Sequence, residues 1–314
     1  MEKLENKLKK GWVIAIVALF CNLLWGSAFP CVKISYELFG VGAGDTASRI
    51  LLAGCRFTLA GIMVVLAGSF LQKKFLKPRM KSMPNLIKLA IVQTVIQYFF
   101  FYVGMANTTG VKGAIVEGSS VFLAILFSAL IFRLEKLSGR KILGCVLGFA
   151  GVTLVNLGGG GLGGGFNLSG VGFVLISAAA YALSSVMIKM YSKDDDTVML
   201  AGYQFILGGI VMIIAGLIMG GRLVPSGASA IGLLVYMAFI SAGAYTLWGV
   251  LLKYNPVSRV TIYGFTNPVF GVILSAIILG EGGAFTFKTA AALVLVCIGI
   301  IAVNRVKQKN SKVS

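Results

Sequence analysis

Apolar runs of about 20 residues, separated by short polar segments, dominate the pattern along this 314-residue chain. A helix of that length crosses the hydrocarbon core of a bilayer, and lipid requires the backbone to satisfy its own hydrogen bonds. The pattern therefore predicts an all-α polytopic membrane protein with ten transmembrane helices. Their expected ranges are 11–31, 48–70, 85–106, 113–132, 138–157, 169–191, 197–219, 229–252, 260–279 and 286–304.

Composition supports a membrane protein and argues against an enzyme. The chain is 58% hydrophobic and 12% charged, with a mean hydropathy of +0.93, which a water-soluble domain does not carry without large exposed apolar patches. It has no histidine, the commonest general base and metal ligand. Its five cysteines lie in or beside apolar runs without CxxC spacing, so we interpret them as packing residues. We expect no catalytic residue, no metal and no cofactor.

The cations indicate how the chain is oriented. Lysine and arginine total 28, against 10 acidic residues, and such a balance also occurs in nucleic-acid-binding proteins. Here the cations fall between apolar runs rather than along a stripe with aromatic residues, which favours a lipid bilayer and no nucleic acid. All but six lie on the side of the termini, which predicts a cell (inner or plasma) membrane protein with both termini cytoplasmic. The six exceptions are Lys33, Arg49, Arg56, Lys112, Arg222 and Lys288.

The middle of the chain separates two related halves. The segment GGGGLGGG (158–165) lacks the Lys-Ser/Thr of a phosphate-binding loop, so we interpret it as a linker. Across it, GCRFTLAGIMVVLAG (54–68) aligns with 201–216, with Gly54 on Gly202 and Phe57 on Phe205. WGSAFPCVK aligns with YALSSVMIK, and the segment ending in Glu135 with the one ending in Glu281. The expected organisation is a first repeat at 11–157, a linker at 158–168, a second repeat at 169–304, and basic cytoplasmic tails at 1–10 and 305–314.

An odd number of helices in each half makes the second half enter the membrane in the opposite orientation. The halves are therefore expected to be inverted five-helix repeats. The charges agree, because Lys33 falls outside and its counterpart Lys189 inside, while Glu135 falls inside and Glu281 outside.

Several of these segments resemble the drug/metabolite transporter superfamily, specifically its ten-helix members with two EamA domains. The resemblance rests on LLWGSAF, CRFTLAG and FRLEKLSGRKILGCVLGFAGV in the first half, and on GYQFILGGI, TNPVFGVILSAIILGE and AALVLVCIGIIAV in the second. It implies ten helices around a central cavity that export amino acids, related metabolites or drugs by alternating access. The chain departs from the family pattern in its fourth helix, which reads GSSVFLAIL where a proline is usual.

Two ionisable residues are candidates for substrate binding or coupling. Glu117 lies within the fourth helix, where a charge is costly unless it faces a cavity or a partner. It would hold a cationic group or take up a coupling proton, and the alternative is a buried ion pair with Arg56 or Lys112. Arg56, one heptad after Arg49, would bind a carboxylate or brace the bundle. Its repeat counterpart is the uncharged Gln204.

The other candidates form polar and aromatic stripes at helical spacing. The alternative for each of them is packing, hydrogen bonding between helices or an aromatic belt at the membrane surface. Asn267 stands beside Pro268, a candidate hinge because proline frees a backbone carbonyl within a helix. The stripes contain Asn22, Trp25 and Phe29; Gln93, Gln97, Tyr98 and Tyr102; and Tyr245 and Trp248.

Three further acidic positions are interpreted as structural. The run Asp194–Asp196 lacks the other positions of a calcium loop and is expected to be a solvated cytoplasmic loop. Glu135 and Glu281 are expected to end equivalent helices.

The favoured function is secondary transport of a small-molecule substrate, with proton coupling or exchange left open. A membrane enzyme would be expected to cluster histidine or acidic residues, and a channel would be expected to have a filter loop or charged rings. No nucleotide-binding motif is present to power primary transport. Substrate, direction and oligomeric state do not follow from the sequence.

Overall fold

The computed structural model describes residues 6–156, 167–280 and 286–304, and this part of the chain is helical throughout, without a strand. Of the predicted linker 158–168, residues 158–166 lie outside the described residues, as do Glu281 and the tail residues 1–5 and 305–314. The first half contains α2 (Gly11–Leu38), α3 (Thr46–Leu71), η1 (Met80–Ser82), α4 (Met83–Leu89), η2 (Ala90–Ile96), α5 (Gln97–Ala106), α6 (Gly110–Glu117), α7 (Ser120–Leu126), η3 (Phe127–Ile131) and α8 (Gly139–Asn156).

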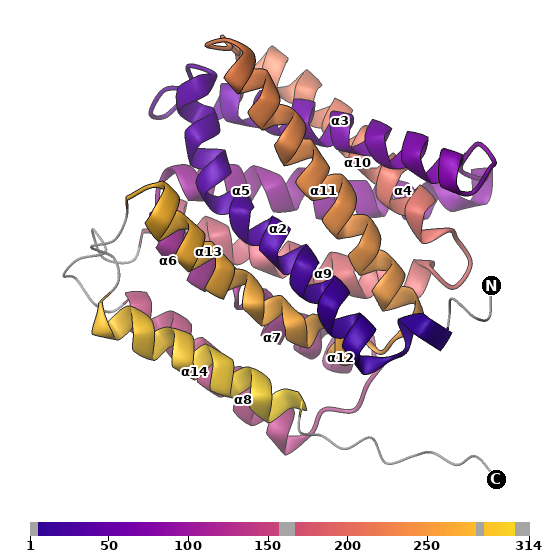
Figure 1. The fold of residues 1–314 in the computed structure, drawn as a ribbon, viewed down its shortest axis with the longest axis vertical. Helices are drawn as coiled ribbons and strands as arrows, with labels where there is room; N and C mark the ends of the chain where they lie inside the picture. The colour runs from indigo at the N-terminus through magenta and orange to yellow at the C-terminus, as the bar shows by residue number, and fades with distance from the viewer. Residues whose placement is uncertain (1–5, 157–166, 281–285, 305–314) are drawn as a thin grey trace.

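The second half contains η4 (Leu168–Gly172), α9 (Phe173–Tyr191), α10 (Thr197–Ile218), α11 (Ala228–Tyr254), α12 (Val257–Thr261), η5 (Ile262–Phe265), α13 (Thr266–Ile278) and α14 (Phe287–Asn304). Within the described residues, eight segments are long and apolar enough to cross a membrane. In the first half they are α2, α3, the run from η1 to α5, and the run from α6 to η3. In the second half they are η4 with α9, α10, α11, and the run from α12 to α13. The helices α8 and α14 have 18 residues each and pack on one another at one side of the bundle (Figure 1).

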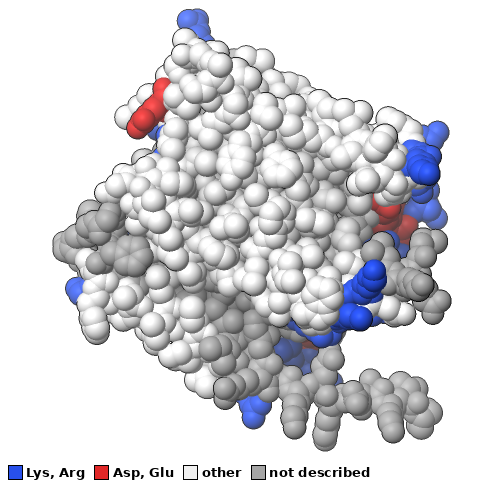
Figure 2. All heavy atoms as spheres, in the orientation of Figure 1, with Lys and Arg blue, Asp and Glu red and all other residues white. Residues whose placement is uncertain are grey.

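The surface in Figure 2 agrees with a bilayer as the solvent. The face shown is almost free of charge, and lysine and arginine gather at its edges. Exposed large apolar side chains cover the outward helix faces, including Leu66, Phe70, Ile218 and Phe239. Such a surface is stable in lipid and not in water.

Three predicted helices are interrupted. The third span contains the π-helix η2 between α4 and α5. The fourth breaks between Glu117 and Ser120, and the ninth passes through the 3-10 helix η5. Breaks at membrane depth are tolerated where the backbone is covered by protein or lines a cavity. The first helix also continues to Leu38 rather than ending near 31. Pro30 is accommodated inside α2, and the Lys33 side chain donates to the carbonyl oxygen of Thr108.

Glycines allow α3 and α10 to lie in direct backbone contact (Figure 1). A Cβ on Gly61 would stand 2.5 Å from the carbonyl oxygen of Gly202, and a Cβ on Gly54 would stand 2.8 Å from that of Gly209. Only glycine permits this approach, which brings the two halves into direct contact.

The expectation of a solvated loop holds for Asp194, which is exposed, but was wrong for Asp195 and Asp196. Asp195 is buried, accepts hydrogen bonds from Ser82 and Arg79, and forms an ion pair with Arg79 at 3.0 Å. Asp196 caps α10 by accepting from the backbone N–H groups of Val198 and Met199. The first N–H groups of a helix need such acceptors, which explains why the Asp196 side chain is fixed at the start of α10.

Candidate functional site

A cavity lies at the centre of the bundle, where the interrupted fourth and ninth spans meet α2, α3, α5, α9 and α11. It offers about 50 Å³ to the centres of water molecules, enough for a few waters but too little for a metabolite. A larger occupant requires the walls to move. The lining residues are Asn22, Trp25, Ala28, Phe29, Arg56, Gln97, Tyr98, Phe101, Glu117, Ser120, Val121, Ala124, Tyr181, Tyr245, Trp248, Thr261, Gly264 and Asn267.

Glu117 is the last residue of α6, directly before the break in the fourth span. It is 7% exposed, and its Oε2 has no hydrogen-bond partner among the described residues. The break is covered by the ninth span, because a Cβ on Gly118 would stand 3.0 Å from the ring of Pro268. The chain therefore places a carboxylate at the end of α6, beside a break that the ninth span covers.

Arg56 is held by neighbours other than Glu117. Its Nε donates to the carbonyl oxygen of Met237 at 3.0 Å, and its Nη1 donates to the hydroxyl of Tyr102 at 3.2 Å. Among the described residues, no ion pair joins Arg56 to Glu117. Lys112, the other expected partner of Glu117, is not in the cavity lining. Arg56 thus braces α3 against α11 and α5 while lining the cavity.

Buried polar atoms without partners concentrate around this cavity. Six lining side chains carry one each within the described part of the chain, whereas a folded protein leaves few buried polar groups unsatisfied. Four of the six are oxygen acceptors and two are indole N–H donors. The atoms are Asn22 Oδ1, Gln97 Oε1, Glu117 Oε2, Asn267 Oδ1, Trp25 Nε1 and Trp248 Nε1.

The orientation of Asn22 is fixed by its other amide atom. Nδ2 donates to the carbonyl oxygen of Ala18 at 2.6 Å, which leaves Oδ1 as the atom available to the cavity. Gln97 is held similarly, since its Nε2 donates to the Tyr245 hydroxyl at 2.9 Å. Tyr245 is also hydrogen-bonded to the hydroxyl of Tyr98 at 2.6 Å. The polar lining is therefore positioned before any ligand arrives.

An aromatic cluster forms another wall. The Trp25 ring meets Tyr181, Tyr245 and Trp248 edge to face, with centroids 5.7, 5.0 and 5.1 Å apart. Aromatic faces attract cations, and the attraction grows when water is excluded. Such a wall suits a cationic or aromatic group of a ligand in the cavity.

The cavity brings together most of the residues predicted for it. Gln93, Tyr102 and Gln204 lie outside its lining. Gln93 lies inside the π-helix η2 and Gln97 directly follows it, so the helical register shifts between them and their spacing of four residues does not put both in the cavity. Gln204 instead accepts a hydrogen bond from Thr94, and Tyr102 stands behind Arg56. The ten predicted residues in the lining are Glu117, Arg56, Trp25, Asn22, Phe29, Gln97, Tyr98, Tyr245, Trp248 and Asn267.

Pro268 lies in the ninth span, and its role as a hinge stays a prediction. It is the third residue of α13, and the 3-10 helix η5 ends just before this helix begins, so the change in helical geometry precedes Pro268. The sequence interpretation also missed Tyr181, Ser120 and Thr261 in the lining. The repeat alignment pairs Tyr181 with Trp25 and could have identified it. Ser120 and Thr261 carried no comparable signal.

The fold, the nearly uncharged face in Figure 2 and the buried polar cavity define a multi-pass membrane transporter, and sequence comparison identifies its family. The chain belongs to the EamA-like transporter family of the drug/metabolite transporter superfamily, which it matches over residues 12–157 and 168–305. Among the described residues, no three His, Cys, Asp or Glu side chains lie close enough together to hold a metal ion.

Similar proteins carry the same general description. One is an uncharacterized transporter YvbV of Bacillus subtilis, 25% identical, with 92% of this chain and 91% of the relative covered. Another is an uncharacterized inner membrane transporter YedA of Escherichia coli K12, 27% identical, with 91% and 87% covered. A solved crystal structure at 19% identity has the same fold, with a TM-score of 0.69 over 94% of this chain and 96% of that one.

Proposed function

We propose that this chain is a secondary transporter that exports a small amine-bearing metabolite of the amino-acid class from the cell interior by alternating access. The supporting observation is the set of unpartnered polar atoms around the central cavity. Four oxygens, one of them a carboxylate, suit the three N–H donors of an ammonium group. The aromatic wall at Trp25 suits the same positive charge, and Arg56 with the indole N–H groups suits a carboxylate.

Alternating access by inverted repeats is supported by contacts between equivalent residues. In the repeat alignment Gly54 corresponds to Gly202, and Gly61 to Gly209. Gly54 meets Gly209 while Gly61 meets Gly202, as a two-fold axis between α3 and α10 requires. The interruption after Glu117 likewise corresponds to the one at η5. Discontinuous helices at the interface of two repeats are characteristic of secondary transporters.

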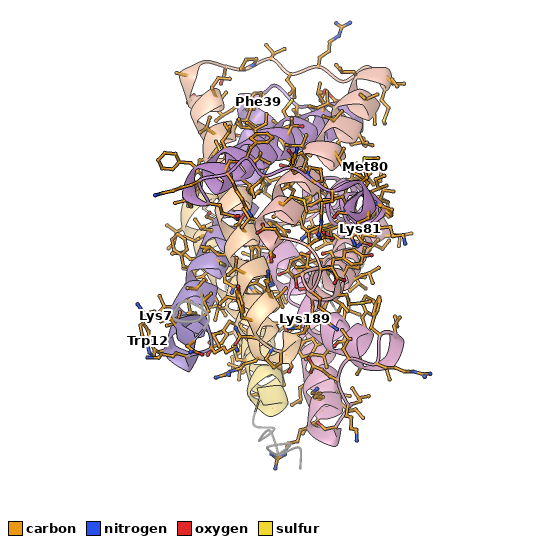
Figure 3. The ribbon with its side chains drawn as sticks, turned by 90° about the vertical axis from the view of Figure 1, so that its right-hand side faces the viewer. Lys7, Trp12, Phe39, Met80, Lys81 and Lys189 are labelled. Atoms are coloured by element: carbon orange, nitrogen blue, oxygen red, sulfur yellow. The ribbon has the colours of Figure 1, made fainter. Side chains whose placement is uncertain are left out.

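A lysine at each end of the bundle extends this symmetry. We call the end where α2 begins the proximal end and the end where α2 finishes the distal end. Lys33 donates to the carbonyl oxygen of Thr108, just beyond α5. Its counterpart Lys189 donates to Leu252, Lys253 and Asn255 at the end of α11. Figure 3 places Lys189 toward the proximal end with Lys7 and Trp12, and Phe39 at the distal end.

The bundle is proposed to have ten spans and a cytoplasmic proximal end. With α8 and α14 as further spans the bundle has ten, and the positive-inside rule places the proximal end in the cytoplasm. Export then carries substrate from the proximal to the distal end. Glu117 serves this cycle either by holding the amine or by exchanging a proton for it.

Counterflow in proteoliposomes tests the function. Amino acids, amines and nucleosides are compared with and without a proton gradient. We expect saturable exchange of amine-bearing solutes, and an effect of the gradient assigns proton coupling. Glu117→Gln should reduce exchange at least about tenfold while folding is retained, whereas Glu135→Gln serves as an acidic control outside the cavity. Exchange of nucleosides alone, or unchanged exchange in Glu117→Gln, would refute the proposed site.

A further inference from the structure

A second cavity opens at the distal end, separate from the central one, and we call it the vestibule. It offers about 370 Å³ to the centres of water molecules, far more than the central cavity, and its lining is mainly polar. Its charged lining residues are Lys33, Glu37 and Arg49. This volume lies in the range of small-molecule binding sites.

Arg49 is the unusual member of this lining. It is 5% exposed, yet its Nε has no hydrogen-bond partner among the described residues. Its Nη2 donates to the carbonyl oxygen of Gly42 at 3.0 Å, and its guanidinium lies 5.4 Å from the centre of the Tyr36 ring. A buried guanidinium held at one nitrogen and unsatisfied at another is arranged to receive an acceptor.

The acidic groups nearby do not supply that acceptor. Asp45 lies close to Arg49 but caps α3, where its Oδ1 accepts from the N–H of Ser48 at 2.9 Å. Glu37 is exposed at the vestibule, and among the described residues no ion pair joins it to Arg49. Neither carboxylate therefore satisfies the Arg49 Nε.

A continuous set of contacts connects the vestibule with the central cavity. Tyr36 lines the vestibule and donates its hydroxyl hydrogen to the carbonyl oxygen of Tyr102 at 2.8 Å. The two rings meet with centroids 6.2 Å apart. Tyr102 in turn receives the hydrogen bond of Arg56, which lines the central cavity. Two guanidinium groups thus lie one heptad apart along α3, about 10 Å, with two tyrosines between them.

We propose that the vestibule is a second binding site, in which Arg49 receives the carboxylate of the transported solute after it leaves Arg56. This rests on the proposed function. A planar guanidinium matches a carboxylate at two points, so the site selects zwitterionic amino compounds over simple amines. The tyrosine pair is the barrier between the two sites, and it separates in the outward-open state.

Binding from the two sides of the membrane tests the vestibule. Right-side-out and inside-out vesicles are supplied with a transported amino acid or with its amine analogue lacking the carboxylate. Arg49→Gln should raise the half-saturating amino-acid concentration at the distal side about tenfold or more. The value for the amine should stay within about twofold, and Arg49→Lys should recover part of the loss. An equal loss for amine and amino acid, or no loss, would overturn the proposal.

The matched control is Arg222→Gln, because Arg222 is exposed near the start of α3, where its N–H meets Ser48, and does not line the vestibule. It should change neither concentration. If the wild-type chain exchanges neither solute, the proposed function fails and acetate still tests the vestibule. Acetate, compared with chloride at equal ionic strength, should raise the unfolding temperature of the wild type and Arg222→Gln but not Arg49→Gln. No acetate effect on the wild type would refute the vestibule site.

Discussion

The rings of Phe57 and Phe205 stack with their centroids 5.3 Å apart, although the two residues occupy equivalent positions in the two halves of the chain. Trp25 and Tyr181 are a second equivalent pair in contact. Residues related by a two-fold axis meet each other only at that axis. These contacts therefore locate the axis of the proposed inverted repeat beside the central cavity, and substrate bound there would contact both halves.

The glycine contacts between α3 and α10 should be intolerant of a single methyl group. Gly61→Ala would press its Cβ against the carbonyl oxygen of Gly202, and Gly209→Ala against the backbone of Thr58. Overpacking of this kind costs about 1–3 kcal/mol. Gly232→Ala is the control, because nothing lies within 4 Å of its Cβ position in α11. Thermal unfolding in detergent should rank both contact variants below the control, and equal stabilities would contradict the close approach.

Lys189 should stabilise the proximal end through the carbonyl groups that finish α11. It donates to three of them, at 2.9, 3.3 and 2.9 Å. Lys189→Met leaves these acceptors without a charged donor, and hydrogen bonds to charged groups contribute about 1.5–3 kcal/mol each. Lys193→Met, at an exposed site just after α9, should be nearly neutral. Chemical unfolding of both variants measures the difference. A Lys193 variant as unstable as the Lys189 variant would indicate a general charge effect.

Periodicity predicted much of the cavity, because regular helices keep residues three and four apart on one face. Asn22, Trp25 and Phe29 follow this rule on α2 and all line the cavity. Gln93 does not, because a π-helix inserted before Gln97 changes the register, and no local residue pattern announced it. Glu117 was recognised by its cost in lipid, but the break beside it depends on packing against the ninth span. Such long-range contacts have no signature in local sequence.

Asp195 should make stability depend on pH. Burial alone raises the pKa of its carboxyl group, but hydrogen bonds from Ser82 and Arg79 outweigh burial and hold the pKa below the ordinary value of 3.8. The folded state therefore binds this proton more weakly than the unfolded state, and stability is lost as pH falls through the region below 3.8. Asp195→Asn should destabilise the protein at pH 6 and lose its disadvantage toward pH 3. Unfolding measured between these values tests this, with the exposed Asp194→Asn as control. A deficit independent of pH would assign the effect to packing.

The three tryptophans provide an optical test of the central cavity that does not require transport. Trp25 and Trp248 line the cavity and are almost fully buried, whereas Trp12 is 65% exposed on the outside of α2. A solute entering between the two indoles displaces water and contacts their unpartnered N–H groups, so it should change the emission of these residues and not of Trp12. Titration of a transported solute should therefore alter the fluorescence of the wild type and of Trp12→Phe to the same extent. The double variant Trp25→Phe/Trp248→Phe retains Trp12 and should give no response. A response that persists in the double variant would place binding outside the central cavity, while its loss in Glu117→Gln would tie the optical change to the carboxylate.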